Sequence, residues 1–155
     1  MTESVAKKIQ ERIGSSKCTL NDVRETSPLD LGAYKFLILG IPTWGIGEVQ
    51  DDWADFMTGL EEMDLSGRTA ALFGLGDQES YPDSFADALG TLYDALQKTG
   101  CQILGSWPAT GYEFEESAAL RGKRFAGLVL DEENQSELTD LRIDDWLGRI
   151  LGLTS

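Results

Sequence analysis

The sequence predicts an α/β fold in which a parallel sheet is covered by helices on both faces. Segments with the apolar spacing of strands alternate with segments that have the spacing of helices. Two of the strand segments, 35–43 and 68–76, are almost continuously apolar, as expected of strands buried on both faces. The chain has 155 residues, of which 41% are hydrophobic, with no repeat and no linker. We therefore expect a single domain over residues 1–155.

Apolar residues three and four positions apart predict four helices. These are 2–13, 51–63, 83–99 and a last helix that Thr139 can cap. Gly14 and Gly100 follow the first and third of these segments, where glycine commonly ends a helix.

Five strands are predicted from the remaining apolar runs. They are a short one at 18–23, the two buried ones, 102–107 and 125–131. A polar segment between Pro108 and Arg124 separates the last two strands. A loop of this length in a compact domain is usually functional or a family-specific insertion.

The composition excludes several classes of function. The net charge of −14 would repel nucleic acid and anionic membranes. It favours a partner with a basic docking face, or it only keeps the protein in solution, and charge alone leaves both explanations open. The chain has no histidine, which excludes a Ser-His-Asp triad, a Cys-His pair and histidine-based zinc or haem sites.

The cysteines and the apolar segments predict a cytoplasmic protein. Cys18 and Cys101 are far apart and form no C-x-x-C motif, so we expect two free thiols in a reducing compartment. No segment approaches the roughly 20 apolar residues of a membrane span. The N-terminus has no pattern of a secretory signal.

Two loops that follow the buried strands are candidates for a binding site. P-T-W-G-I-G-E covers residues 42–48, and G-L-G-D-Q-E-S-Y-P-D-S-F covers 74–85. Ligands of open parallel sheets bind beyond the carboxyl ends of the strands, and each of these loops has one aromatic residue, Trp44 or Tyr81. Two such rings suit a flat conjugated ligand, or they simply cover the edge of the sheet.

Both loops closely resemble the flavin loops of the flavodoxins. Further similarity lies in G-Y-E-F at 111–114, in F-A-G-L-V-L-D-E-E-N-Q from Phe125 and in the L-T-D-L-R-I-D-D-W tail. The resemblance covers nearly the whole chain, and the segment between the last two strands resembles the insertion of long-chain members. It implies a doubly wound, three-layer α/β/α fold with a five-stranded parallel sheet in the order 2-1-3-4-5 and an insertion in the last strand.

The resemblance also implies the residues that bind FMN. Trp44 and Tyr81 would sandwich the isoalloxazine ring, and the peptide between Gly45 and Ile46 would flip with redox state. Glu48 and Asp77 would hold negative charge nearby, with Glu133 approaching the ribityl side. The implied binding residues are Thr2, Thr43, Trp44, Gly45, Ile46, Gly47, Leu75, Gly76, Asp77, Tyr81 and Ser84.

The implied function is that of a low-potential, one-electron carrier with non-covalently bound FMN, not an enzyme. The carboxylates would disfavour the negative charge of fully reduced flavin, so the second electron would enter at low potential. The implied partners are ferredoxin/flavodoxin–NADP reductase and other redox proteins with basic faces, such as photosystem I, nitrogenase or oxidoreductase systems. The carrier would be a monomer that binds neither nucleic acid, membrane nor metal.

The start of the sequence departs from the family pattern. Flavodoxins begin with a strand and a phosphate loop of the type T-x-T-G-x-T, followed by a helix. Here the sequence begins at that helix, with Thr2 in the place of the last loop threonine. We expect that roughly a dozen residues, the first strand and most of the loop, precede an internal Met1.

Three other functions are alternatives to the carrier. An FMN-dependent NAD(P)H reductase would need a nicotinamide pocket and a proton donor, and the sequence shows neither. A response-regulator receiver would need an aspartate where the buried strand ends, but residues 40–43 contain none. A degenerate, FMN-free protein follows only if the chain really lacks its first strand.

Overall fold

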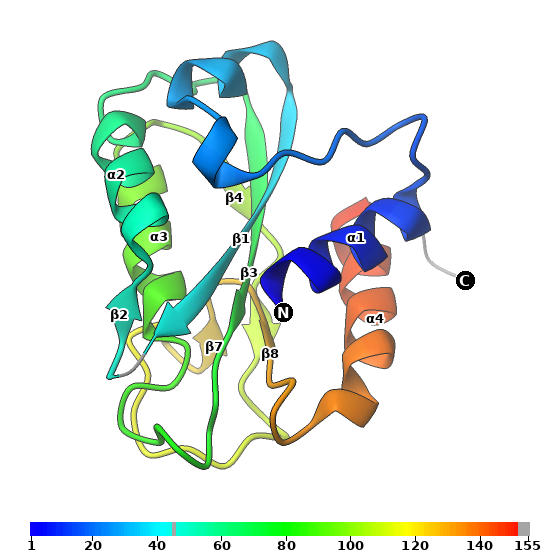
Figure 1. Ribbon diagram of the computed structural model, residues 1–155, viewed down its shortest axis with the longest axis vertical. Coiled ribbons are helices and arrows are strands. Elements are labelled where there is room, and N and C mark those ends of the chain that lie inside the picture. The colour runs from blue at the N-terminus through cyan, green and yellow to red at the C-terminus, as the bar shows by residue number, and fades with distance from the viewer. Residues whose placement is uncertain (45, 152–155) are drawn as a thin grey trace.

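The computed structural model describes residues 1–44 and 46–151, which form three layers (Figure 1). A central sheet has α2 (Asp51–Leu60) and α3 (Asp87–Gln97) on one face. On the other face lie α1 (Thr2–Ile13) and α4 (Thr139–Leu151). The predicted fold class, a mostly parallel sheet covered by helices on both faces, is confirmed.

The centre of the sheet is a long parallel pair of strands, β1 (Phe36–Trp44) and β3 (Thr69–Leu75). On the other edge of β3, β4 (Gln102–Leu104) pairs with the first half of the strand and β8 (Leu128–Leu130) with the second half. Both pairings are parallel, so β4 and β8 are two halves of one strand position. The predicted insertion in the last strand is therefore present.

The insertion folds as a small antiparallel sheet in the order β5-β7-β6. The three strands are β5 (Trp107–Pro108), β6 (Leu120–Arg121) and β7 (Arg124–Phe125). Its aromatic residues pack against Phe85 in the loop after β3, with Phe114 at a ring-centroid distance of 5.3 Å and Phe125 at 6.1 Å. The insertion thereby supports that loop from behind.

The edge of β1 that faces away from β3 is largely open. The two-residue strand β2 (Glu48–Val49) pairs there, antiparallel, with Thr43 and Trp44 only. For 36–42, the described residues provide no strand partner on this edge. The strand predicted at 18–23 is wrong: 18–22 are irregular and lead into the 3-10 helix η1 (Val23–Glu25). A strand forms only where a neighbour can pair with it, and a cavity lies between this segment and β1.

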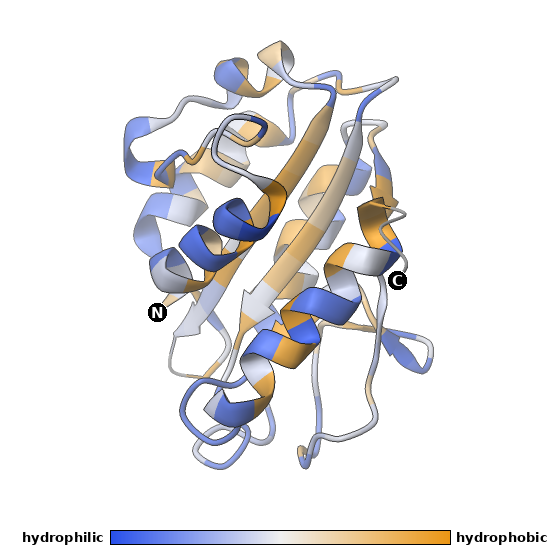
Figure 2. Ribbon diagram, turned by 90° about the vertical axis from the view of Figure 1, so that its right-hand side faces the viewer, coloured by the Kyte–Doolittle hydropathy of each residue, from blue (hydrophilic) through white to orange (hydrophobic). Residues whose placement is uncertain are grey.

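Burial follows the predicted apolar faces. Figure 2 shows β1 and β3 as apolar strands, while the covering helices turn hydrophilic residues outward. The core includes Ile41, Leu72 and Trp146, all fully buried. Two more 3-10 helices, η2 (Pro28–Ala33) and η3 (Ser136–Leu138), complete the described elements.

The structure bears on the two cysteines and on the possibility of a membrane-spanning helix. Cys18 and Cys101 are free thiols, as predicted, and burial raises the pKa of both. Among the described residues, no helix combines the length and the hydropathy that crossing a membrane requires.

Candidate functional site

A cavity of about 1110 Å³ connects the two candidate loops with the open edge of β1. At one end it is lined by Thr43 and Trp44 from the end of β1, and by Gly76, Asp77 and Tyr81 from the loop after β3. Since β1 and β3 are parallel neighbours, their carboxyl ends meet at one edge of the sheet. The two loops therefore converge on one site, as the sequence predicted.

Trp44 and Tyr81 line this cavity without being buried in the core. The exposed fraction is 50% for Trp44 and 40% for Tyr81. A tryptophan that only closed the edge of the sheet would bury most of its ring, because burial of a large aromatic side chain is strongly favourable. Accessible aromatic surface at a cavity is instead typical of a site that takes an apolar, flat ligand.

The loop after β3 has a tightly fixed backbone. The Gly76 N–H donates to the carbonyl of Leu130 at 3.1 Å, and the Tyr81 N–H donates to the carbonyl of Asp77 at 2.9 Å. A Cβ added at Gly76 would lie 2.8 Å from the backbone nitrogen of Ala86, so the loop passes too close to its neighbour for any side chain. The glycine is required for packing, and the loop is held before any ligand arrives.

Asp77 is the charged group of this loop that lines the cavity. Partial burial acts to raise the pKa of its carboxyl group, but hydrogen bonds outweigh that effect. The backbone N–H of Ser80 donates to Asp77 Oδ1 at 3.0 Å, and Asn134 Nδ2 donates to the same oxygen at 2.8 Å. The pKa of Asp77 is therefore lowered, and the carboxyl group is ionised at neutral pH.

The loop after β1 is fixed at both ends. Thr43 Oγ1 accepts a hydrogen bond from the Ala88 N–H at the start of α3, at 3.1 Å. Gly47 has a φ of +90°, and a Cβ added there would lie 2.7 Å from Asp87 Oδ2. Between them, Ile46 is 78% exposed, and Gly45 lies outside the described residues.

The structure brings most of the predicted binding residues to this cavity. Those that line it are Thr2, Thr43, Trp44, Leu75, Gly76, Asp77 and Tyr81, together with Glu133. Ile46, Gly47, Glu48 and Ser84 do not line it. Ser84 is buried, and its N–H donates to the carbonyl of Tyr81, so it supports the loop from behind. The role of each residue toward a ligand stays a prediction.

The N-terminal end of α1 lies at the same cavity. Met1 and Thr2 line it, and no side chain caps the helix there. The first amide groups of a helix have no partner within the helix, and together with the helix dipole they favour a negatively charged group. The amide groups at this end of the cavity are therefore suited to an anionic part of a ligand, whereas the carboxylate of Glu3 in the same turn, which also lines the cavity, opposes it.

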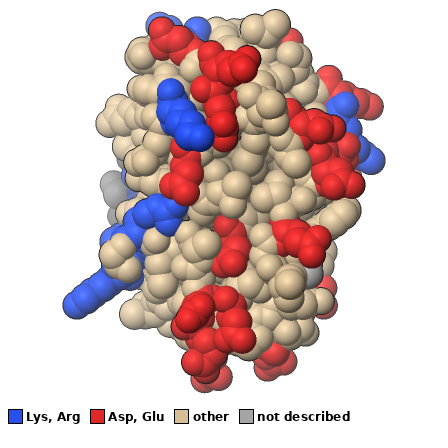
Figure 3. All heavy atoms as spheres, turned by 90° about the vertical axis from the view of Figure 1, so that its left-hand side faces the viewer, with Lys and Arg blue, Asp and Glu red and all other residues tan. Residues whose placement is uncertain are grey.

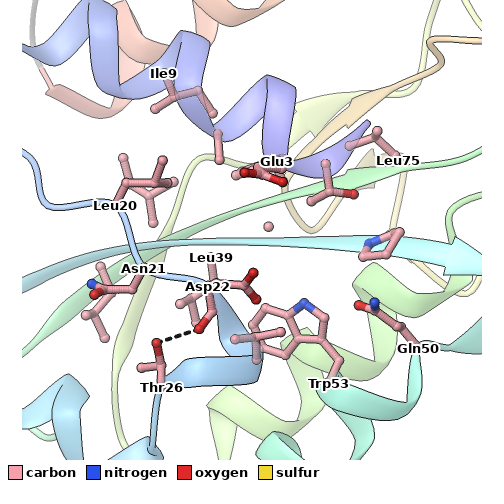
Figure 4. Close-up of a pocket in the computed structure, with 18 of the residues that line it drawn as sticks. Glu3, Ile9, Leu20, Asn21, Asp22, Thr26, Leu39, Gln50, Trp53 and Leu75 are labelled. Carbon is pink, nitrogen blue, oxygen red and sulfur yellow. Dashed lines mark hydrogen bonds between the residues drawn. The ribbon is translucent and has the colours of Figure 1, made fainter.

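Away from the two loops, the cavity continues along β1. Figure 4 shows Ile9 of α1 and Leu20 on one side of the strand that carries Leu39, with Trp53 and Gln50 on the other side. The walls of this part combine apolar side chains of α1, β1 and α2 with polar ones, among them Glu3, Asn21 and Asp22. We call it the β1 groove, and it is bounded by 36–40 of β1, by α1, by 17–26 and by Trp53 and Phe56.

Sequence reasoning missed the buried network behind the loop after β3. Asp131 is fully buried, and its carboxylate accepts hydrogen bonds from the backbone and the side chain of Gln78. The only signal in the sequence is the D-E-E-N-Q segment after the last strand, whose first and fourth residues are Asp131 and Asn134.

Negative charge dominates the face of the molecule formed by α2 and α3. In Figure 3, Asp and Glu side chains are spread over this face, with fewer Lys and Arg side chains between them. The charge of the whole chain is −14. Such a surface attracts partners with basic faces.

Fold and site together define a class of protein. A helix-covered parallel sheet with a two-aromatic cleft at its carboxyl edge is the arrangement of α/β proteins that bind a flat nucleotide-like cofactor.

Comparisons with known proteins narrow this class to one family. The sequence model of the family described as "Flavodoxin" matches residues 1–146. "Flavodoxin 1" of Escherichia coli K12 is 47% identical over 150 residues, which are 96% of this chain and 85% of that protein. A flavodoxin of Nostoc sp. PCC 7120 is 45% identical over 149 residues, which are 96% of this chain and 88% of that protein.

Solved structures agree with the sequence comparisons. Fusobacterium nucleatum flavodoxin bound to flavin mononucleotide superposes with a TM-score of 0.93 at 32% identity. The match covers 100% of this chain and 92% of that one. The chain belongs to the flavodoxin family.

Proposed function

We propose that this protein is a one-electron carrier that binds FMN non-covalently at the end of the cavity between the loops after β1 and β3. The observation that carries the proposal is that Trp44 and Tyr81, from neighbouring strand ends, line one cavity with about half of their surfaces accessible. When bound, FMN supplies the redox chemistry, and the protein sets its potential and its access to partners.

The residues present fit this group. The rings of Trp44 and Tyr81 offer two apolar faces to a flat ring system, and Gly76 and Asp77 offer backbone groups to its polar edge. Thr2 and the uncapped start of α1 suit the phosphate. The remaining residues implied by the resemblance complete the proposed site: Thr43, Gly45, Ile46, Gly47, Leu75, Ser84 and, toward the ribityl chain, Glu133.

Electron transfer accounts for the site better than catalysis does. The chain contains no histidine, the side chain that most often transfers protons in catalysis. The relatives are named flavodoxins. An FMN-dependent reductase would oxidise NAD(P)H in the steady state without a partner protein, and we expect the isolated protein not to do so.

The acidic surface supports redox partners with basic faces. We propose a flavodoxin reductase that draws on NADPH as one partner, and low-potential systems such as photosystem I or nitrogenase as others. Encounters steered by opposite charges are fast and slow down as salt is added. The protein would act as a monomer in the cytoplasm.

The β1 groove supports one more proposal about the same site. Backbone groups of 36–42 on the open edge of β1 have no strand partner among the described residues, and apolar side chains such as Ile9 and Trp53 line the same groove. Unpaired strand edges are costly wherever they are shielded from water, and one further strand parallel to β1 would pair with these groups. We propose that a first strand occupies the groove and that the loop after it reaches the start of α1, where it would hold the phosphate.

Binding of FMN tests the proposed function directly. The purified chain is titrated with FMN by visible absorption and fluorescence, alone and with an N-terminal extension read from the genomic sequence upstream of the Met1 codon. We expect yellow protein with quenched flavin fluorescence, and binding weaker by several orders of magnitude without the strand and its phosphate contacts. A colourless extended protein that ignores added FMN would overturn the proposal.

Single substitutions localise the site. Trp44→Ala and Tyr81→Ala each remove one ring face and should weaken FMN about tenfold or more. Leu141→Ala, which removes an exposed apolar side chain on α4 outside the cavity, is the control and should leave the affinity unchanged. An in-frame stop codon immediately before Met1 would contradict the added first strand without touching the FMN proposal.

A further inference from the structure

The loop that presents Asp77 and Tyr81 is tied to a buried carboxylate that lies outside the cavity. Asp131, at the end of the last strand position, is fully buried and does not line the cavity. In the part of the chain that the structure describes, every hydrogen bond it accepts comes from a neutral N–H group. Burying a carboxylate is costly unless its oxygens are fully satisfied, so this set of donors is needed to keep it there.

The donors come from two segments that are far apart in the sequence. Gln78 donates from its backbone at 3.0 Å and from Nε2 at 2.7 Å, both to Asp131 Oδ2. The N–H groups of Glu133 and Asn134 donate to Oδ1 at 3.1 and 3.0 Å. Gln78 Oε1 in turn accepts from the N–H of Glu113 in the insertion at 2.6 Å. Asp131 therefore joins the loop after β3, the loop after β8 and the insertion.

Asn134 links this buried group to the cavity. Its Nδ2 donates to Asp77 Oδ1 at 2.8 Å and to both oxygens of Asp131 at 3.1 and 2.9 Å. One amide group thus donates to two carboxylates and offsets part of the repulsion between them. Asp77 Oδ1 also accepts from the Ser80 N–H, which closes the turn that leads to Tyr81.

We propose that Asn134 and Asp131 are positioning residues that hold the 76–81 turn in the conformation that binds the ligand. They act through Asp77 and Gln78 and do not touch the ligand themselves. The inference rests on the proposed function, since it assigns the 76–81 turn to the FMN site. It goes beyond that function because it assigns a role to residues outside the cavity.

The charges around Asp77 give the proposal a readout that needs no cofactor. Asp131 lies across the amide of Asn134 from Asp77, and the cavity that Asp77 lines is also lined by Glu132 and Glu133 and by the cations Lys17 and Arg24. The donors that favour ionised Asp77 are the N–H group of Ser80, the Asn134 amide, the Ser80 side chain and the N–H group of Glu79. Removing the Asn134 amide takes away one donor and leaves the carboxylates, so the pKa of Asp77 should rise.

The test compares Asn134→Ala with Gln97→Ala in the protein without FMN. Gln97 is a matched control, because its Nε2 donates to a side-chain oxygen, Tyr93 Oη, at 2.9 Å on an exposed helix surface. Asn134→Ala should raise the pKa of Asp77 in a carbon-detected NMR titration and speed amide exchange at Gln78 and Ser80 about tenfold. Gln97→Ala should change neither quantity. Equal titration and exchange in the two variants would overturn the positioning role.

A second measurement separates this inference from the proposed function. With FMN added to the extended protein, Asn134→Ala should weaken binding about tenfold relative to Gln97→Ala. Equal FMN affinity in the two variants would overturn the role in ligand binding. If the parent protein binds no FMN, the proposed function fails, while the titration and the exchange rates still decide whether Asn134 fixes the turn. Asn134→Ser keeps a short donor, so its titration and its FMN affinity should lie between those of Asn134→Ala and those of the parent protein.

Discussion

The hydroxyl group of Thr43, at the end of β1, accepts the hydrogen bond that the N–H of Ala88 donates at the start of α3. The residue in the N-cap position of this helix is Ala86, which has no side-chain acceptor and adopts a left-handed conformation with φ of 54°. The side chain of a strand residue 45 positions earlier therefore caps the helix. The same contact fixes the start of the loop that carries Trp44.

Thr43→Val keeps the shape of the side chain and removes this acceptor. We expect the free energy of unfolding to fall by about 1 kcal/mol, as for the loss of a helix cap. Urea denaturation followed by circular dichroism measures the change. Thr58→Val is the control, since the Thr58 hydroxyl only bonds back to Ala54 within the exposed side of α2. An equal loss in both variants would show that the hydrogen bond from Ala88 to Thr43 does not contribute to the free energy of unfolding beyond a generic threonine-to-valine effect.

Gly76→Ala should distort the loop after β3. The added Cβ would lie 2.8 Å from the backbone nitrogen of Ala86 and 2.9 Å from the ring of Phe85. Neither group can move away freely in the core, so we expect a loss of about 1–3 kcal/mol in the free energy of unfolding, together with weaker FMN binding. Gly32→Ala, whose Cβ meets only a side-chain atom of Arg68 at 3.9 Å, is the control. Unchanged stability in Gly76→Ala would mean that the loop is not held against Ala86.

The raised pKa of Tyr112 leads us to expect a loss of stability at alkaline pH. Its hydroxyl accepts a hydrogen bond from Trp107 Nε1 and donates to the carbonyl of Val129, and burial raises its pKa to about 12 from the usual 10.0. The folded protein holds this proton more tightly than the unfolded chain does. The resulting stability is complete below about pH 10 and is lost as the pH rises toward 12, to a total of about 2–3 kcal/mol.

Tyr112→Phe tests this pH dependence. At neutral pH the variant should be less stable by about 1–3 kcal/mol, because the buried partners of the hydroxyl are left unsatisfied. Between pH 10 and 12 the difference from the parent protein should shrink, since only the parent has this phenol to deprotonate. Tyr93→Phe, at a hydroxyl on an exposed helix surface, should show no such convergence. A difference that stays constant up to pH 12 would contradict a raised pKa.

Charge at the site should set the potential of the second electron. Asp77→Asn removes a carboxylate that lines the cavity, whereas Glu48→Gln removes an exposed one on β2 that does not. Both substitutions should raise the second reduction potential, and Asp77→Asn should raise it more, because Coulomb energy falls with distance and with solvent exposure. Potentiometric titration of the FMN-loaded protein measures both. Equal small shifts would argue against Asp77 as the closer charge.

The long elements were predictable from local pattern alone. α1 begins at Thr2 and ends at Ile13, as predicted, because one apolar face and Gly14 define it. β1 and β3 differ from the prediction by one residue at each end, since continuous apolar runs of that length fit a buried strand. The helix predicted at 83–99 starts only at Asp87. The turn before it bonds to the insertion, where the Phe85 N–H donates to the carbonyl of Glu116 at 3.2 Å, a tertiary contact that spacing does not reveal.

The remaining features depend on contacts between distant segments or on short signals. The 3-10 helix η2 begins with a capping box of Ser27 and Asp30, but the element is too short to show the apolar spacing that predicts a helix. The convergence of Trp44 and Tyr81 was predicted, because parallel strands carry their loops to one edge. The burial of Asp131 could not be predicted, since its donors are brought together only by the finished sheet and insertion.

The division of one strand position between β4 and β8 has a consequence for how the edge of the sheet closes during folding. β3 pairs with β4 at 69–71 and with β8 at 73–75, and about two dozen residues of insertion separate the two halves along the chain. The edge of the sheet is therefore completed by two segments that return over connections of similar length, 76–101 before β4 and 105–127 before β8, so two loop closures carry an entropic cost. Gly127 lies where the second connection returns to the sheet: a methyl group there would meet the carbonyl oxygen of Leu72 and block the chain from docking.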